Sequence, residues 1–368
     1  MKILCVSHSS GVAGAEKVFA RSIQALSSMN DIFLVKPIGI GNFDSLLSKD
    51  INIRGSFTLS YRLMGNSTFR IIIKLLLSIP SVFKLTYIIK RNQIEIVYVN
   101  TIVNWAGVIA AKICKRKCIV HCHEHPNSFE EYSSTKLDFL LSFIIRHSSA
   151  KIIYISEEMK EIWRKRLSYY NDCVVYNPIS ITSYSSSDAI KKSDIQVIGF
   201  AGTLYKRKNV ETLIFATSKL LEVFPNVKLI IAGDGPQRDQ LEELTKKLGI
   251  SECVNFVGQV KEMESFYNSI DIIVLPSYAE AMPLVVVEAL SYSIPCIVTR
   301  NTALSEVICF DNAVFVFSPE NINELTLLLE NTLPNCRKLS KHLTKNQKNI
   351  FKNIGADFDK ELLEAIDE

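Results

Sequence analysis

Two glutamates eight positions apart, Glu280 and Glu288, have the chemistry and spacing to bind a sugar and a ribose. The apolar run 270–275 before them is typical of a buried parallel strand, and ligands bind beyond the carboxyl ends of such strands. Pro283 suits the first position of the following helix, whose free N–H groups can hold a diphosphate. Glu288 can then accept hydrogen bonds from ribose hydroxyls, while Glu280 contacts the sugar. The pattern favours a nucleotide-sugar site; the alternative is an ordinary strand-loop-helix with two surface carboxylates.

A run of three cations, Lys206-Arg207-Lys208, follows a second predicted strand and precedes a helix. Cations at a helix start face the positive end of the helix dipole, so they destabilise the helix unless an anion lies beside them. We therefore expect Lys208 to lie beside the diphosphate and to stabilise it as a leaving group. The alternative is that all three cations are solvated surface charges.

Three histidines at alternate positions, His121, His123 and His125, end a predicted strand in the first half of the chain and share one strand face. Two of them have a spacing found in zinc sites, but no second ligand pair at a typical zinc spacing appears, so no metal is expected. We interpret His123 as a hydrogen-bond donor or proton-handling group, and the other two as buried structural histidines. Gly14 opens a helix after the first strand, where its backbone can approach an acceptor or a phosphate.

One alternation of strands and helices occurs twice along the chain. Strands are predicted at 3–7, 32–35, 94–99, 118–122, 152–155 and 174–176, and again at 197–201, 227–232, 254–257, 272–275, 294–298 and 314–317. The helical segments between them predict parallel sheets, and the serine-rich run 179–188 is the best candidate for a linker. The fold class is therefore α/β, with two Rossmann-like doubly wound domains, 1–180 and 181–368, facing across a cleft. The last helices, from 335 onward, can pack back on the first domain.

Composition excludes several other classes of protein. The 368 residues carry a net charge of +4, which is too small to argue for nucleic acid, and 48% of them are hydrophobic, as in ordinary globular proteins. Nine scattered cysteines, an odd number, favour a reducing cytoplasm over a disulfide framework. No segment predicts a transmembrane helix, and the first residues are too short a stretch for a signal peptide. We expect a cytoplasmic protein.

Residues 54–91 combine basic and apolar side chains, and no acidic residue occurs between Asp50 and Glu95. The basic residues of this stretch are Arg54, Arg62, Arg70, Lys74, Lys84, Lys90 and Arg91. An in-plane helix on an anionic membrane surface has this composition, and each basic residue near the surface adds ~1 kcal/mol. The alternative is a core helix with a solvated basic face.

Together these residues resemble the retaining glycosyltransferases of family 4 (glycosyl transferases group 1), which have the GT-B fold. The resemblance covers nearly the whole chain, and the matching pieces occur in the family's order. They are residues 11–16, 96–100, 123–124, 176–178, 202–209, 233–236, 256–260 and the E-x(7)-E motif at 280–288. Each piece alone is a weak signal, whereas the full ordered set is a specific one.

The resemblance implies a role for each matching position. Glu288 is expected to bind the ribose of a nucleotide-diphosphate donor, Lys208 the diphosphate, and Glu280 hydroxyls of the transferred sugar. His123 matches a histidine that lies against the donor sugar near its anomeric carbon. The remaining donor-binding positions are the backbone of Met282, Pro283 and Leu284 for the phosphate and sugar, and Gly258 to Val260 for the base. Such enzymes need no cofactor beyond the donor substrate, and usually no essential metal.

Thr203 is a departure from the family pattern. Many members carry an arginine at this position, which shares the diphosphate with the lysine. We therefore expect Lys206 or Arg207 to supply the missing charge beside Lys208.

The expected function is that of a retaining hexosyltransferase-type enzyme. It would move a sugar from a nucleotide-diphosphate donor, with a UDP-sugar favoured, to a hydroxyl of a glycan or lipid-linked glycan in lipopolysaccharide or capsule biosynthesis. We expect it to lie peripherally on the inner face of the cytoplasmic membrane. Two alternatives remain: a nucleotide-sugar epimerase on the same fold, and a non-catalytic GT-B scaffold. Glu280, Glu288, Lys208 and His123 argue against the scaffold.

Overall fold

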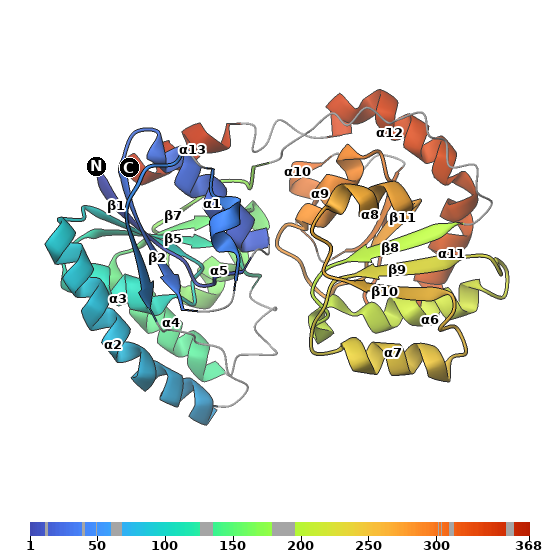
Figure 1. The fold of residues 1–368 in the computed structure, drawn as a ribbon, viewed down its shortest axis with the longest axis horizontal. Coiled ribbons are helices and arrows are strands. Elements are labelled where there is room, and N and C mark those ends of the chain that lie inside the picture. The colour runs from blue at the N-terminus through green and yellow to red at the C-terminus, as the bar shows by residue number, and fades with distance from the viewer. Residues whose placement is uncertain are drawn as a thin grey trace. The chain divides into compact units, whose positions relative to one another are not determined.

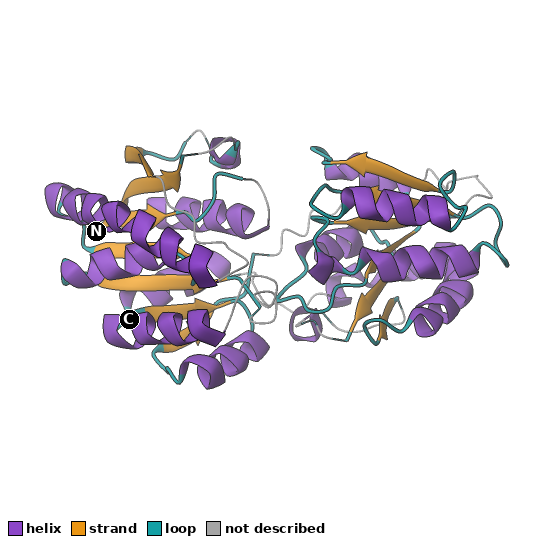
Figure 2. Cartoon of the chain, turned by 90° about the horizontal axis from the view of Figure 1, so that it is seen from below, coloured by secondary structure: helices purple, strands orange, loops and turns teal. Residues whose placement is uncertain are grey.

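The chain forms two compact units, each built around one parallel sheet. The computed structural model describes residues 1–11, 14–38, 41–48, 50–59, 68–125, 135–178, 196–300, 302, 304–308, 313–350 and 357–368. The first unit comprises residues 1–178 and 354–368, and the second comprises 179–353 (Figure 1). In both units helices flank the strands (Figure 2), so the predicted α/β class with two doubly wound sheets is confirmed. The predicted linker, 179–188, lies outside the described residues.

The first unit has a seven-stranded sheet in the order β3-β2-β1-β4-β5-β6-β7. Its strands are β1 (Lys2–Val6), β2 (Asp31–Pro37), β3 (Ile53–Leu59), β4 (Ile96–Asn100), β5 (Lys117–Cys122), β6 (Lys151–Tyr154) and β7 (Asp172–Val174). Its helices are α1 (Gly14–Ser27), η1 (Phe43–Leu46), α2 (Thr68–Asn92), α3 (Trp105–Ile113), α4 (Thr135–Ser148), α5 (Glu157–Leu167) and α13 (Phe358–Asp367). The central strands are buried on both faces, which explains their continuous apolar runs.

The second unit has a six-stranded sheet in the order β10-β9-β8-β11-β12-β13. Its strands are β8 (Val197–Ala201), β9 (Lys228–Ala232), β10 (Val254–Gly258), β11 (Ile272–Leu275), β12 (Cys296–Thr299) and β13 (Val314–Phe317). Its helices are η3 (Lys206–Lys208), α6 (Val210–Leu220), α7 (Arg238–Lys247), α8 (Met263–Ser269), α9 (Leu284–Ser291), α10 (Leu304–Val307), α11 (Ile322–Thr332), η4 (Leu333–Asn335) and α12 (Cys336–Ile350).

The two C-terminal helices belong to different units. Helix α12 is part of the second unit, whereas α13 packs on α1 of the first. Arg21 of α1 forms an ion pair with Asp359 of α13 at 2.7 Å, and Lys117 donates to the carbonyl of Ile366 at 2.5 Å. The last residues of the chain therefore complete the fold of the first unit.

Helix α2 exposes apolar side chains in its second half. Ile79, Phe83 and Tyr87 are 43%, 70% and 57% exposed, and they follow one another at steps of four residues. Arg62 and the side chains of Arg70 and Lys74 lie outside the described residues. Among the helices that the structure describes, none has both the length and the apolar character to cross a membrane.

Candidate functional site

The strand order of each sheet reverses at one point, and ligands of doubly wound sheets bind at the carboxyl ends of the strands beside that point. In the first sheet the reversal lies between β1 and β4, and in the second between β8 and β11. Lys208 follows β8 and Glu280 follows β11, so the second reversal has a charged residue on each side.

Lys208 and Glu280 form an ion pair at this reversal. The ammonium of Lys208 lies 2.5 Å from Oε1 of Glu280, and both side chains are only 11–12% exposed. Arg207 lies on the same carboxylate oxygen at 3.8 Å. Burial lowers the pKa of Lys208, and the Glu280 charge offsets part of that shift. Burial alone would raise the pKa of Glu280, but the two cations outweigh it and leave that pKa lowered, so the carboxylate is ionised.

Asn209 fixes the loop that carries these cations, a role that the sequence analysis missed. It adopts a left-handed conformation with φ 51°, and its side chain donates to the carbonyl of Pro276 at 3.1 Å. The amide of Tyr278 donates in turn to the carbonyl of Arg207 at 2.9 Å. Asparagine tolerates this backbone conformation better than most residues, which is the signal that could have identified the position.

Pro283 caps the next helix rather than forming its first residue, so the prediction of its position was wrong by one residue. It has φ −78° and ψ 90°, which is extended backbone, and α9 begins at Leu284. Its carbonyl accepts from the amide of Val286 at 2.9 Å, and Met282 before it is buried. The amides of the first turn of α9 thus follow the loop after β11 and lie four to six residues from Glu280 in sequence.

Glu288 lies within α9 and is oriented by a tyrosine that the sequence analysis missed. The hydroxyl of Tyr267 donates to Oε2 of Glu288 at 2.7 Å, and the Tyr267 ring stacks on Tyr292 with centroids 4.9 Å apart. Burial, reinforced by the Glu288 charge, raises the pKa of Tyr267, so this phenol stays protonated and remains a donor. The hydrogen bond sets the direction of the carboxylate.

Glycine turns bring the ends of β8, β9 and β10 together. Gly233 has φ 137°, its amide donates to the carbonyl of Gly258 at 2.7 Å, and a Cβ there would lie 1.8 Å from the carbonyl oxygen of Gly202. Only glycine fits this position. Thr203 is exposed and Val260 is half-buried, on the loops that leave Gly202 and Gly258. The predicted donor-binding positions of this unit therefore lie at the carboxyl ends of β8, β10 and β11 of one sheet, in the loops that follow them, or in α9.

His123 follows β5 of the first unit and lies against His121, with ring centroids 4.1 Å apart. Within the described residues neither ring nitrogen of His123 has a hydrogen-bond partner, although both are buried. Burial lowers the pKa of His123 well below its usual value, and His121 and His8 add to the shift. The ring is therefore neutral, with one nitrogen able to donate and one to accept. The predicted burial of His121 and His125 is confirmed.

Further polar residues surround His123. His8 bridges Glu16, at 3.4 Å, and Asn100, at 3.1 Å, and Glu16 stands in the first turn of α1, two residues after Gly14. Glu124 accepts from the amide of His123 at 3.2 Å, and burial raises the pKa of this carboxyl to about 7. In the described part of the chain no group of three or more His, Cys, Asp and Glu residues has the arrangement of a metal site.

Two family models match the chain, one in each half. The model of glycosyl transferases group 1 matches residues 185–350, and the model of glycosyltransferase family 4 matches residues 60–183. The chain belongs to the family 4 glycosyltransferases.

Relatives and solved structures agree with this assignment. A glycosyltransferase of Haemophilus influenzae is 27% identical over 49% of this chain and 52% of its own length. The Escherichia coli UDP-Gal:alpha-D-GlcNAc-diphosphoundecaprenol alpha-1,3-galactosyltransferase is 26% identical over 62% of this chain and 63% of its own. Each match covers less than two thirds of the relative. The crystal structure of Anabaena Alr3699/HepE in complex with UDP-glucose superposes with a TM-score of 0.79 at 19% identity, over 100% of this chain and 99% of that one. This likeness confirms the GT-B fold.

Proposed function

We propose that this family 4 glycosyltransferase is a retaining enzyme that transfers one sugar from a UDP-sugar to a hydroxyl of a lipid-linked glycan in surface polysaccharide synthesis. The observation that carries the proposal is the buried Lys208–Glu280 pair beside the start of α9. The names of the relatives support the substrate classes: the Anabaena structure holds UDP-glucose, and the Escherichia coli enzyme acts on a diphosphoundecaprenol-linked sugar.

Each donor group has a candidate partner in the second unit. The ribose hydroxyls suit Glu288, whose direction Tyr267 sets. The diphosphate suits Lys208 and the amides at the start of α9, and the hydroxyls of the sugar suit Glu280. Donor binding would therefore draw Lys208 from Glu280 toward the phosphate, and Arg207, 3.8 Å from the same carboxylate oxygen, would supply a second charge for the diphosphate.

The transfer step breaks the bond between the anomeric carbon and the diphosphate oxygen, and forms a bond from the same carbon to the acceptor oxygen on the same face. The electron pair of the broken bond leaves with the nucleoside diphosphate, and the acceptor proton passes to an oxygen of that diphosphate. Lys208 stabilises the charge that develops on the leaving group, in place of a metal. His123, which is neutral and whose ring nitrogens have no hydrogen-bond partner among the described residues, would hold a sugar hydroxyl near the anomeric carbon.

Helix α2 would hold the enzyme on the inner face of the cytoplasmic membrane. Phe83 and Tyr87 are more than half exposed, and Lys84, Lys90 and Arg91 lie among them as exposed cations. Aromatic and basic side chains on one helix suit the boundary between lipid headgroups and acyl chains.

The decisive test is calorimetric titration of UDP and GDP with EDTA present, followed by incubation with radiolabelled UDP-sugar and bacterial membranes. We expect UDP to bind without metal and label to move into lipid. Label in a new free sugar would identify an epimerase. Failure of both nucleotides to bind, with no transfer of label, would favour a scaffold or a donor with a different nucleotide.

A further inference from the structure

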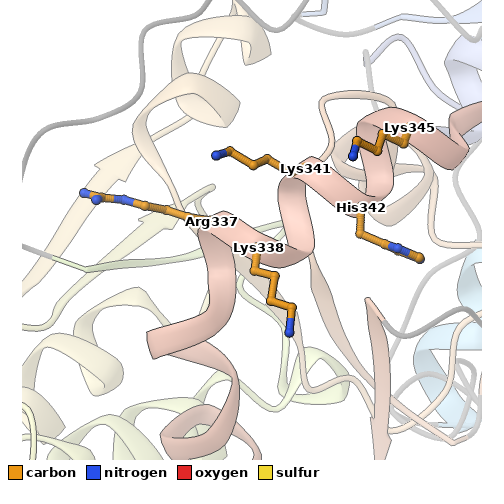
Figure 3. A pocket seen from close by; sticks show the side chains of 5 residues that line it. All are labelled: Arg337, Lys338, Lys341, His342 and Lys345. Atoms are coloured by element: carbon orange, nitrogen blue, oxygen red, sulfur yellow. The ribbon is translucent and has the colours of Figure 1, made fainter.

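Helix α12 of the second unit carries a row of basic side chains that the proposed reaction does not use. Arg337, Lys338, Lys341, His342 and Lys345 line a hollow of about 530 Å³ along this helix. Figure 3 shows them on successive turns, with Arg337, Lys341 and Lys345 extending to one side. The whole of α12, from Cys336 to Ile350, contains no acidic residue.

The buried side of α12 anchors the row: Leu343 is fully buried and Cys336 is 7% exposed. Beside the row, the hydroxyl of Thr344 donates to that of Ser293 at 2.9 Å. The cations at 338, 341 and 345 are exposed. The helix therefore presents its charges outward from a fixed backbone.

These charges destabilise α12 in the absence of an anion. Arg337, Lys341 and Lys345 are like charges at i, i+4 spacing, and such pairs are unfavourable on a helix surface. Arg337 and Lys338 also stand in the first turn, where they face the positive end of the helix dipole. Over the residues that the structure describes, none of the ion pairs includes Lys338, Lys341 or Lys345. A ligand with several negative charges would relieve the repulsion between Lys341 and Lys345 and that between Lys338 and the helix dipole.

We propose that α12 binds the phosphate headgroups of an anionic lipid bilayer. The row extends about 12 Å along the helix, and its lysines at 338, 341 and 345 are exposed, so it is long enough to contact several lipid headgroups at once. Among the described side chains that line the hollow, none is Phe, Tyr or Trp and His342 is a single ring, which is too little to stack successive bases, and a net charge of +4 is small for a nucleic-acid binder. This surface works by charge alone, unlike α2 with its exposed Phe83, and it does not depend on the transfer reaction.

The test is cosedimentation with vesicles of phosphatidylglycerol and phosphatidylcholine in equal parts. A variant with Lys338→Gln, Lys341→Gln and Lys345→Gln should partition on the order of 100-fold more weakly at low salt, because each basic residue near an anionic surface contributes about fivefold. The matched control, Lys246→Gln, Lys247→Gln and Lys261→Gln, changes the net charge equally on another exposed part of the unit and should change partition only a few-fold. Raising the salt concentration should abolish the difference between the two variants.

The role of α12 is separable from those of α2 and of the donor site. Phe83→Ser should weaken vesicle binding at both high and low salt. The α12 variant should bind vesicles more weakly than the wild type at low salt only. Both variants should bind UDP as the wild type does. Unchanged vesicle binding in the α12 variant would overturn the proposal. So would α12-dependent binding of inorganic pyrophosphate or duplex DNA as tight as that of the vesicles, which would assign the row to soluble polyanions.

Discussion

The two sheets have similar topology, but the residues at their carboxyl edges differ in chemical type. Both sheets are parallel and reverse their strand order once. At the edge of the first sheet lie Asn100, His121 and His123, each with a buried polar atom that has no hydrogen-bond partner in the described part of the chain. At the edge of the second lie glycine turns, a helix start and one internally paired cation and carboxylate. The first edge offers neutral hydrogen-bonding groups, and the second offers main-chain amides and charge.

This difference suits two kinds of ligand. A diphosphate needs close approach of amides and a cation, which glycine turns and Lys208 provide. A sugar hydroxyl needs one donor and one acceptor, which a neutral histidine provides. The two edges can be tested separately because they belong to different units.

Replacing Lys208 should have the largest effect. Lys208→Ala removes the ammonium that lies 2.5 Å from Glu280 and should lower kcat by 100- to 1,000-fold, the typical loss of a group that stabilises developing charge. Lys206→Ala, a neighbouring exposed lysine, is the matched control and should change kcat little. Equal losses in the two variants, measured by initial rates of sugar transfer, would refute a special role for Lys208.

The glycine turn of the second edge should matter for folding. Gly233→Ala would place Cβ 1.8 Å from the carbonyl oxygen of Gly202 at φ 137°, and should cost about 3 to 4 kcal/mol of unfolding free energy. Gly249→Ala is the control, because Gly249 has φ 70° with open space around its Cβ, and should cost about 1 kcal/mol. Urea denaturation measures both. Similar costs at the two positions would mean that the close approach of Gly233 to Gly202 is not needed.

At the first edge, Glu124 should make stability depend on pH. Its pKa is about 7 in the folded protein against 4.5 ordinarily, so the native state binds more protons between these values. Stability from this group is fully present below pH 4.5 and is lost as pH rises through 7, by up to about 3 kcal/mol. Glu124→Gln should remove that loss.

His121 and His123 also make stability depend on pH, so their contribution has to be separated from that of Glu124. The pKa values of His121 and His123 are lowered, so these residues reduce stability as pH falls below 6.5, the opposite direction. They are unchanged in Glu124→Gln, so the difference between variant and wild type isolates the carboxyl. A difference in unfolding free energy that stays constant from pH 5 to 8 would contradict the raised pKa.

The sequence predicted most of the fold because the central strands are continuous apolar runs. It missed β3, an edge strand whose residues alternate between half-buried and exposed and lack such a run. It placed Glu280, Lys208 and Glu288 correctly beyond strands or in a helix, because motif spacing fixes those positions. It could not assign the roles of Tyr267 and Asn209, because these roles depend on contacts between residues that are 21 and 67 positions apart, even though asparagine is a signal for the backbone conformation at 209.

A last pair of variants at the edge of the second sheet tests which cation, Lys206 or Arg207, takes the place of the arginine that many family members carry at the position of Thr203. Arg207 lies 3.8 Å from Glu280 and its carbonyl is held by Tyr278, whereas Lys206 is exposed. Arg207→Ala should therefore weaken UDP binding about tenfold, within the range of a charge-assisted hydrogen bond, while Lys206→Ala should weaken it less than twofold. Calorimetric titration of UDP into the two variants decides between them. A larger loss in Lys206→Ala would show that the exposed Lys206, and not Arg207, supplies the second positive charge for the diphosphate. The edge of the second sheet would then bind the diphosphate partly through an exposed group, unlike the buried groups at the edge of the first sheet.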